Sequence, residues 1–307
     1  MAVIQVSSGP DGPMPFTTSE RLSHTLQRGL APTRGPVTVM IHGYRYGPGA
    51  GGDCPHRALF DPTGTLAPVR GQSWARKLGL DAPDRLGIGF GWNGLSTLPQ
   101  AFVQAGQAGA NLARLVRLIR QLAPDRQIQL IGHSMGARVA LAALPALGPE
   151  DVGRIVLLTG AEFTQTARAA LTSPAGRSAT VLNVTSREND LFDFLTECLL
   201  PAPARGDRVI GAGLAAPNVI DLQLDHRDAL HALRRLGFAI PAEPKRICHW
   251  STYLRDGVFP LYRAFLDDDL PAALLRAALP DSHDPRWSRL LPHLPAPPAL
   301  PFRPKPT

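Results

Sequence analysis

Short apolar runs alternate along the chain with longer segments of mixed polarity. Six runs rich in Val, Ile and Leu are typical of buried strands, and they cover residues 37–41, 86–92, 127–131, 154–159, 180–185 and 219–224. In the segment 98–122, leucines and an isoleucine recur at helical spacing among arginines, which predicts an amphipathic helix lying on a sheet. Strands that alternate with helices predict the α/β class, with a mostly parallel central sheet flanked by helices.

The length of 307 residues is sufficient for a large core. We expect a single α/β domain over residues 1–279, with loop insertions at about 47–72 and 194–218 that could cover a pocket. Residues 280–307 contain many prolines and are predicted to form an irregular tail, packed as an arm or partly disordered.

One serine lies between the strand 127–131 and an alanine-rich helical segment. The sequence here is Gly132-His133-Ser134-Met135-Gly136, with the pattern Gly-x-Ser-x-Gly. Where a strand turns sharply into a helix the two elements crowd each other, so glycine is needed on both sides of the serine. The serine then takes a strained backbone conformation that lifts its hydroxyl above the positive end of the helix dipole. This setting is typical of a catalytic nucleophile.

With this motif the chain resembles the α/β-hydrolase superfamily of serine esterases and lipases, over roughly residues 37–266. The resemblance implies the α/β-hydrolase fold and cleavage of a small-molecule carboxylic ester or related acyl compound through an acyl-enzyme, without a cofactor. It also implies a Ser-His-Asp triad, with the acid after the second strand beyond the serine and the histidine after the last strand. The alternative is a catalytically inactive scaffold of the same fold that binds a ligand or a protein.

The family order places the acid in residues 186–193. Three carboxylates lie there, Glu188, Asp190 and Asp193. Asp190 is our prediction, because in related hydrolases the acid is a few residues past the strand and just before a hydrophobic pair. Asp193 is the second candidate.

Two of the nine histidines remain as candidates for the general base, His226 and His249. His226 follows the strand 219–224 closely, but it also fits the first turn of the amphipathic pattern 227–237 as an ordinary surface residue. His249 precedes the last helical segment, among small and aromatic residues, as the base does in related hydrolases. We therefore predict that His249 takes the serine proton.

Two backbone N–H groups are needed to stabilise the negative charge that develops on the substrate carbonyl oxygen. One is expected from Met135, in the first turn of the helix after the serine. The second is expected from Tyr44, because His42-Gly43 after the strand 37–41 resembles the His-Gly-x oxyanion motif of the same family.

Charge and metal-ligating residues add little to this picture. The formal net charge is +7, but nearly all the positive charge comes from scattered arginines. Without a basic helix or an aromatic-interleaved patch, we expect no nucleic-acid partner. The Cys and His residues near 53–56 and at 248–249 lack the spacing of a zinc site, so no metal is expected either.

The remaining features concern the compartment. The three cysteines are too few for a disulfide framework, and the chain does not begin with the pattern of a signal peptide. No apolar stretch approaches the roughly 18 to 20 residues that cross a bilayer. We expect a cytoplasmic protein without a membrane span, whose oligomeric state the sequence does not indicate.

Overall fold

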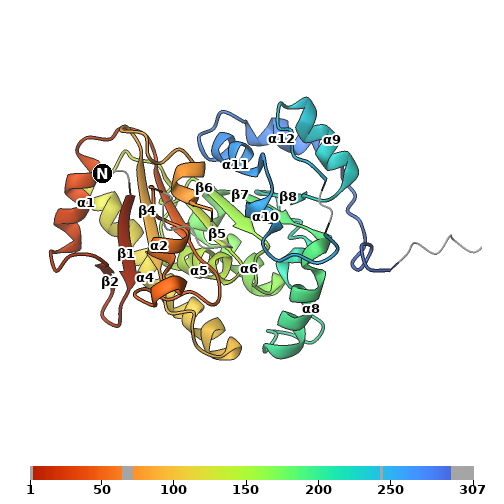
Figure 1. Ribbon diagram of the computed structural model, residues 1–307, viewed down its shortest axis with the longest axis horizontal. Helices are drawn as coiled ribbons and strands as arrows, with labels where there is room; N and C mark the ends of the chain where they lie inside the picture. The colour runs from red at the N-terminus through yellow and green to blue at the C-terminus, as the bar shows by residue number, and fades with distance from the viewer. Residues whose placement is uncertain (1–2, 64–71, 243–244, 292–307) are drawn as a thin grey trace, which may run out of the picture.

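The computed structural model describes residues 3–63, 72–242 and 245–291. One eight-stranded sheet forms its centre, with the strand order β2-β1-β4-β3-β5-β6-β7-β8 (Figure 1). The strands are β1 (Val3–Ser8), β2 (Pro13–Pro15), β3 (Val37–Ile41), β4 (Leu86–Gly91), β5 (Ile128–His133), β6 (Arg154–Leu158), β7 (Thr180–Thr185) and β8 (Val219–Gln223). The edge pair β1–β2 is antiparallel, and the other neighbouring pairs are parallel. The predicted fold class, a mostly parallel sheet flanked by helices, is confirmed.

Helices cover both faces of the sheet. One face carries α1 (Leu22–Leu30), α4 (Leu98–Leu122), α5 (Met135–Ala143), α6 (Thr164–Leu171) and α7 (Pro174–Ser178). The other face carries α2 (Pro55–Ala58), α3 (Trp74–Lys77), α9 (Arg227–Arg235), α10 (Ser251–Leu254), α11 (Val258–Leu266) and α12 (Ala272–Ala278). A further helix, α8 (Asp190–Leu199), projects from the body at the bottom of Figure 1. In the part of the chain described, no helix is both long and apolar enough to span a bilayer.

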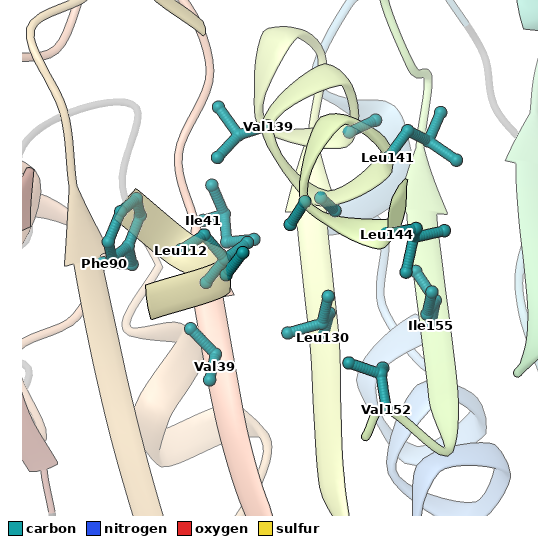
Figure 2. Packing of buried hydrophobic residues seen from close by; sticks show 14 of the residues in the cluster. Val39, Ile41, Phe90, Leu112, Leu130, Val139, Leu141, Leu144, Val152 and Ile155 are labelled. Carbon is teal, nitrogen blue, oxygen red and sulfur yellow. The ribbon is translucent and has the colours of Figure 1, made fainter. Parts of the chain in front are cut away.

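The sheet divides the apolar core into two layers. Successive side chains of a strand point to opposite faces, so Val39 and Ile41 of β3 belong to one layer and Met40 to the other. Figure 2 shows Val39 and Ile41 of β3 and Leu130 of β5 on the face that α5 covers with Val139 and Leu141. Because these strands are buried on both faces, they read in the sequence as continuous apolar runs.

The predicted strands and the long helix are present, with shifts of one or two residues at their ends. The elements that precede the first predicted strand, β1, β2 and α1, were not predicted. Prolines occupy both ends of β2, as is typical of an edge strand that needs few ladder hydrogen bonds. In the expected insertion at 194–218, α8 continues through the first six residues to Leu199.

The other expected insertion, 47–72, contains α2 and a short 3-10 turn (Gly51–Asp53), and its residues 64–71 lie outside the described part. Residues 280–291 of the predicted tail are described and pack as an arm, because the Trp287 N–H donates to Asp190 and Arg286 pairs with Glu197. Residues 292–307 lie outside the described part.

Four adjacent parallel strands, β3, β5, β6 and β7, end at one edge of the sheet. The segments that follow them carry the residues singled out in the sequence. In open α/β sheets, ligands bind at the carboxyl ends of the strands, so this edge is where a functional site is expected.

Candidate active site

Ser134 lies at the turn between β5 and α5 in a strained backbone conformation, with φ 55° and ψ −121°. A Cβ on Gly132 would lie 2.6 Å from the carbonyl oxygen of Gly136, and a Cβ on Gly136 would collide with the carbonyl oxygen of Ile41. Both glycines are therefore required by close backbone contacts, as the sequence predicts. Together they hold Ser134 at the amino-terminal end of α5.

The segment after β3 lies directly against this turn. A Cβ on Gly43 would lie 2.9 Å from both the His133 carbonyl oxygen and the Ser134 Cβ. Tyr44 follows Gly43, and its side chain is anchored by a hydrogen bond of 3.1 Å from its hydroxyl to the Ser96 carbonyl. Tyr44 and Met135 line the same pocket as Ser134. Met135 is the first residue of α5, so its N–H has no partner within the helix.

His42 holds this segment in place and takes no part in the pocket lining. Its Nε2 accepts a 2.9 Å hydrogen bond from the Trp92 N–H, and its Nδ1 donates to the Gly43 carbonyl at 2.8 Å. Its ring stacks on the Trp92 indole, with the centroids 5.2 Å apart. Complete burial lowers the pKa of His42 to about 3, so the imidazole is neutral and serves as a fixed link between β3 and β4.

Ser134 opens into a cavity of about 590 Å³ at the carboxyl edge of the sheet. Residues from several separate segments line the cavity. They include Tyr44, Ser134, Met135, Phe192, Leu195, Leu199, His249 and Trp250. The structure thus brings the predicted nucleophile, the predicted base and both predicted N–H donors to one cavity.

His249 is held by contacts from several parts of the chain. Its backbone carbonyl accepts hydrogen bonds from His133 Nε2 at 3.0 Å and from Thr159 Oγ1 at 3.3 Å. The Phe192 ring stacks on the imidazole, with the centroids 4.7 Å apart. Burial, together with the neighbouring His133, lowers the pKa of His249 well below its usual value. The imidazole is therefore neutral near pH 7, as a general base must be.

The Nδ1 of His249 lies 2.6 Å from the Oδ1 of Asn189. The Asn189 amide nitrogen donates to Asp193 Oδ1 at 2.7 Å, which leaves the amide oxygen to face His249. Nδ1 therefore carries the ring proton, and Nε2 keeps its lone pair. In the described chain the Ser134 hydroxyl and His249 form no direct hydrogen bond. In free enzymes such contacts are often long and shorten only when substrate binds.

The expected contact between Asp190 and His249 is contradicted by the geometry. Asp190 Oδ2 accepts the Trp287 N–H at 2.7 Å, and Oδ1 lies 3.3 Å from the Arg187 guanidinium. Asp190 is the first residue of α8, and its side chain points to the arm 280–291, whereas the preceding residue, Asn189, faces His249.

The other two carboxylates do not hydrogen-bond to the His249 ring either, although Asp193 lines the same cavity. Glu188 is fully buried and pairs with Arg255, and its backbone carbonyl accepts the Cys248 N–H at 3.0 Å. Asp193 accepts a hydrogen bond from the Asn189 amide, and it is this amide that contacts the His249 ring. Among the described residues, the group on His249 Nδ1 is thus an amide and not a carboxylate.

His226 lies outside the cavity. It is the N-cap of α9, and its Nδ1 accepts the Ala229 N–H at 3.4 Å. This is the first-turn position that the amphipathic pattern indicates. Of the two candidate bases, His249 is the one that lines the cavity with Ser134.

Sequence reasoning missed two residues of the site, Asn189 and Thr159. Asn189 lies in the segment 186–193, where the prediction considered only carboxylates. An asparagine orients the histidine in some cysteine proteases. Thr159 immediately follows β6, has a positive φ of 40° and donates a hydrogen bond to the His249 carbonyl. No sequence signal distinguishes it. The described residues contain no group of three or more His, Cys, Asp or Glu side chains placed to hold a metal.

A family model matches part of the chain and agrees with the fold. The model of the family described as "alpha/beta hydrolase fold" matches residues 82–193, from β4 to the start of α8. Among solved structures, a Trichoderma reesei cutinase bound to a phosphonate inhibitor is 14% identical, with 52% of this chain and 71% of the cutinase covered and a TM-score of 0.29. A metagenomic carboxyl esterase is also 14% identical, with coverages of 77% and 76% and a TM-score of 0.37. No curated protein matches the chain.

The fold and the site define an α/β protein with a serine at a glycine-flanked strand-to-helix turn. The α/β-hydrolase family model matches the part of the chain, residues 82–193, that contains this turn.

Proposed function

We propose that the protein is a serine hydrolase that cleaves carboxylic esters or related acyl bonds through an acyl-enzyme. The observation that carries the proposal is the pairing of Ser134, strained at the head of α5, with a neutral His249 in the same cavity. A serine hydroxyl needs such a base to become a nucleophile at neutral pH.

The chemistry follows from the positions of these groups. Ser134 Oγ attacks the substrate carbonyl carbon while His249 Nε2 takes the hydroxyl proton. The negative charge that forms on the carbonyl oxygen is stabilised by the N–H groups of Met135 and Tyr44. As the bond to the leaving oxygen breaks, His249 gives that oxygen the proton. In the second step the imidazole takes a proton from water, which adds to the acyl carbon. The bond to Ser134 Oγ then breaks, the imidazolium returns the proton to Oγ, and the acid leaves.

Asn189 takes the place of the triad carboxylate. Its amide oxygen accepts the His249 Nδ1 proton, so it fixes the ring orientation and the tautomer. A neutral amide stabilises the imidazolium less than a carboxylate does, and we therefore expect a slower enzyme than one with a directly contacting acid.

The cavity favours an apolar acyl group. Its walls include Met135, Phe192, Leu195, Leu199 and Trp250. A volume of about 590 Å³ is in the range of cavities that enclose small ligands, and exceeds what an acetyl group fills. We propose a substrate with an acyl chain of several carbons and a neutral leaving group.

The alternative, a scaffold that binds a ligand without turning it over, is favoured by one observation, the amide at the acid position. The two functions differ in a simple assay with p-nitrophenyl acetate, butyrate and octanoate. The wild type is expected to hydrolyse all three, the longer esters with higher kcat/KM, and Ser134→Ala is expected to lose this activity. Binding of octanoate without turnover of any ester by the wild type would establish the scaffold instead.

A further inference from the structure

The Asn189 amide forms a bridge between His249 and a buried carboxylate. Asn189 immediately precedes α8, and Asp193 lies four residues further on, in the first turns of that helix. One side of the amide contacts His249 Nδ1 at 2.6 Å and the other contacts Asp193 Oδ1 at 2.7 Å. An ionised carboxylate only accepts hydrogen bonds, so Asp193 can face only the NH₂ side of the amide. The oxygen side then necessarily faces His249.

We propose that Asp193 is a positioning residue that acts through the Asn189 amide and sets the tautomer of His249. The inference rests on the proposed role of His249 as the base. In this arrangement the Asn189 amide separates the Asp193 carboxylate from the imidazole. A carboxylate that does not contact the histidine thus decides which ring nitrogen carries the proton.

The surroundings of Asp193 restrict the bridge to this geometry. The side chain is 4% exposed. A Cβ on Gly211 would collide with its carboxylate, so glycine is needed there to leave room for it. Gly211 is in turn held by a 2.6 Å hydrogen bond from Arg187 to its carbonyl. On the other side of the bridge, the stacked Phe192 ring limits rotation of His249.

The charges around Asp193 come from three elements. Arg187 lies before α8, Asp190 and Glu197 lie on α8, and Arg286 lies on the arm 280–291. Burial raises the pKa of Asp193 to about 7, the two arginines lower it and the two carboxylates raise it. Asp193 therefore changes protonation state near neutral pH, while His249, whose pKa is well below its usual value, stays neutral.

Protonation of Asp193 reverses the bridge. The carboxylic acid has an O–H donor, which the Asn189 oxygen accepts when the amide turns over. The NH₂ group then faces His249 Nδ1, which becomes an acceptor, and the ring proton moves to Nε2. A protonated Nε2 cannot take the Ser134 proton. The active arrangement needs the ionised carboxylate of Asp193. Because the pKa of Asp193 is raised to about 7, this arrangement is present above about pH 7 and is lost as the pH falls through that value.

Three variants test the bridge. Asp193→Asn removes the charge with little change in shape and is expected to lower kcat about 10- to 100-fold, as loss of an indirect partner does at other sites, with KM nearly constant. The double exchange Asn189→Asp with Asp193→Asn moves the carboxylate onto His249 and keeps an amide behind it. It is expected to recover most of the lost kcat. Asp190→Asn, on the same helix but turned away, is the matched control.

A second readout does not depend on turnover. The ¹⁵N shifts of the His249 ring, measured by NMR, report which nitrogen carries the proton. In the wild type we expect the Nδ1–H tautomer at pH 8 and a shift towards Nε2–H at pH 6. In Asp193→Asn we expect no such pH-dependent change, and in the exchange we expect Nδ1–H at both values. The NMR titration of the wild type tests the proposal even where a variant fails to fold.

The proposal is overturned by a His249 tautomer that does not change with pH in the wild type. It is also overturned if Asp193→Asn keeps its kcat, or loses it without recovery in the exchange. Failure of the proposed function would give a different result. Neither the wild type nor any variant would then hydrolyse an ester, while the His249 tautomer would still change with the protonation of Asp193.

Discussion

The two sides of the site are built by different physical means. The nucleophile side, Ser134 with Gly43, Gly132 and Gly136, is fixed by backbone contacts between neighbouring parallel strands. The base side is assembled by side chains from the loop after β7, from residues 248–255 and from the arm 280–291. The first side is encoded within a few residues of sequence, whereas the second depends on contacts between residues far apart in the chain.

Removing the base is expected to have the largest effect. His249→Ala should lower kcat about 10⁶-fold, because loss of the histidine in a triad costs nearly as much as loss of the whole triad. His226→Ala is the control and should keep wild-type kcat and KM, since His226 caps α9 outside the cavity. Steady-state kinetics on p-nitrophenyl butyrate measures both. Equal losses in the two variants would show that the base side is assigned wrongly.

The base side also depends on a buried ion pair for its stability. Glu188 and Arg255 are almost completely buried, so Glu188→Gln removes a carboxylate charge that the buried guanidinium contacts. The expected loss in the free energy of unfolding is about 3–5 kcal/mol, measured by urea denaturation. The control is Glu20→Gln, which breaks an exposed pair with Arg28 and should leave the midpoint nearly unchanged. A Glu188 variant as stable as the wild type would mean that the apolar layers alone hold this side.

On the nucleophile side, we expect one added methyl group, in Gly43→Ala, to lower activity. Gly43→Ala places a Cβ 2.9 Å from the His133 oxygen and from the Ser134 Cβ, which pushes the Tyr44 N–H away from the substrate oxygen. We expect kcat to fall about 10²–10³-fold, as for loss of one oxyanion donor, with a small change in KM. Gly153→Ala, where the nearest atom lies at 3.9 Å, should have no effect. Unchanged kcat in the Gly43 variant would exclude Tyr44 as a donor.

The smallest effect is expected at Asp190. Its side chain contacts Arg187 and the Trp287 N–H, and burial raises its pKa, so a neutral amide is tolerated there. Asp190→Asn should lower kcat/KM less than about threefold, against the roughly 10⁴-fold loss expected of a triad acid. A loss of that larger size would restore Asp190 as the acid and contradict the geometry.

These differences explain what the sequence could predict. The sheet, the long helix and the glycine-flanked turn follow from apolar periodicity and from local crowding, and the sequence contains both signals. The choice between Asn189, Asp190 and Asp193 depends on the direction in which α8 leaves β7 and on where the arm 280–291 packs. One residue of helix rotation, about 100°, decides which side chain meets His249, and no local pattern encodes that rotation.

Labelling with a fluorophosphonate tests the central claim most directly, because the probe reacts with an activated serine and needs no knowledge of the substrate. The account predicts one phosphonyl group per wild-type chain, located on Ser134 by peptide mass spectrometry. Ser134→Ala should take up none while its thermal midpoint stays close to that of the wild type. Labelling of another residue, or equal labelling of Ser134→Ala, would contradict the assignment of Ser134 as the nucleophile.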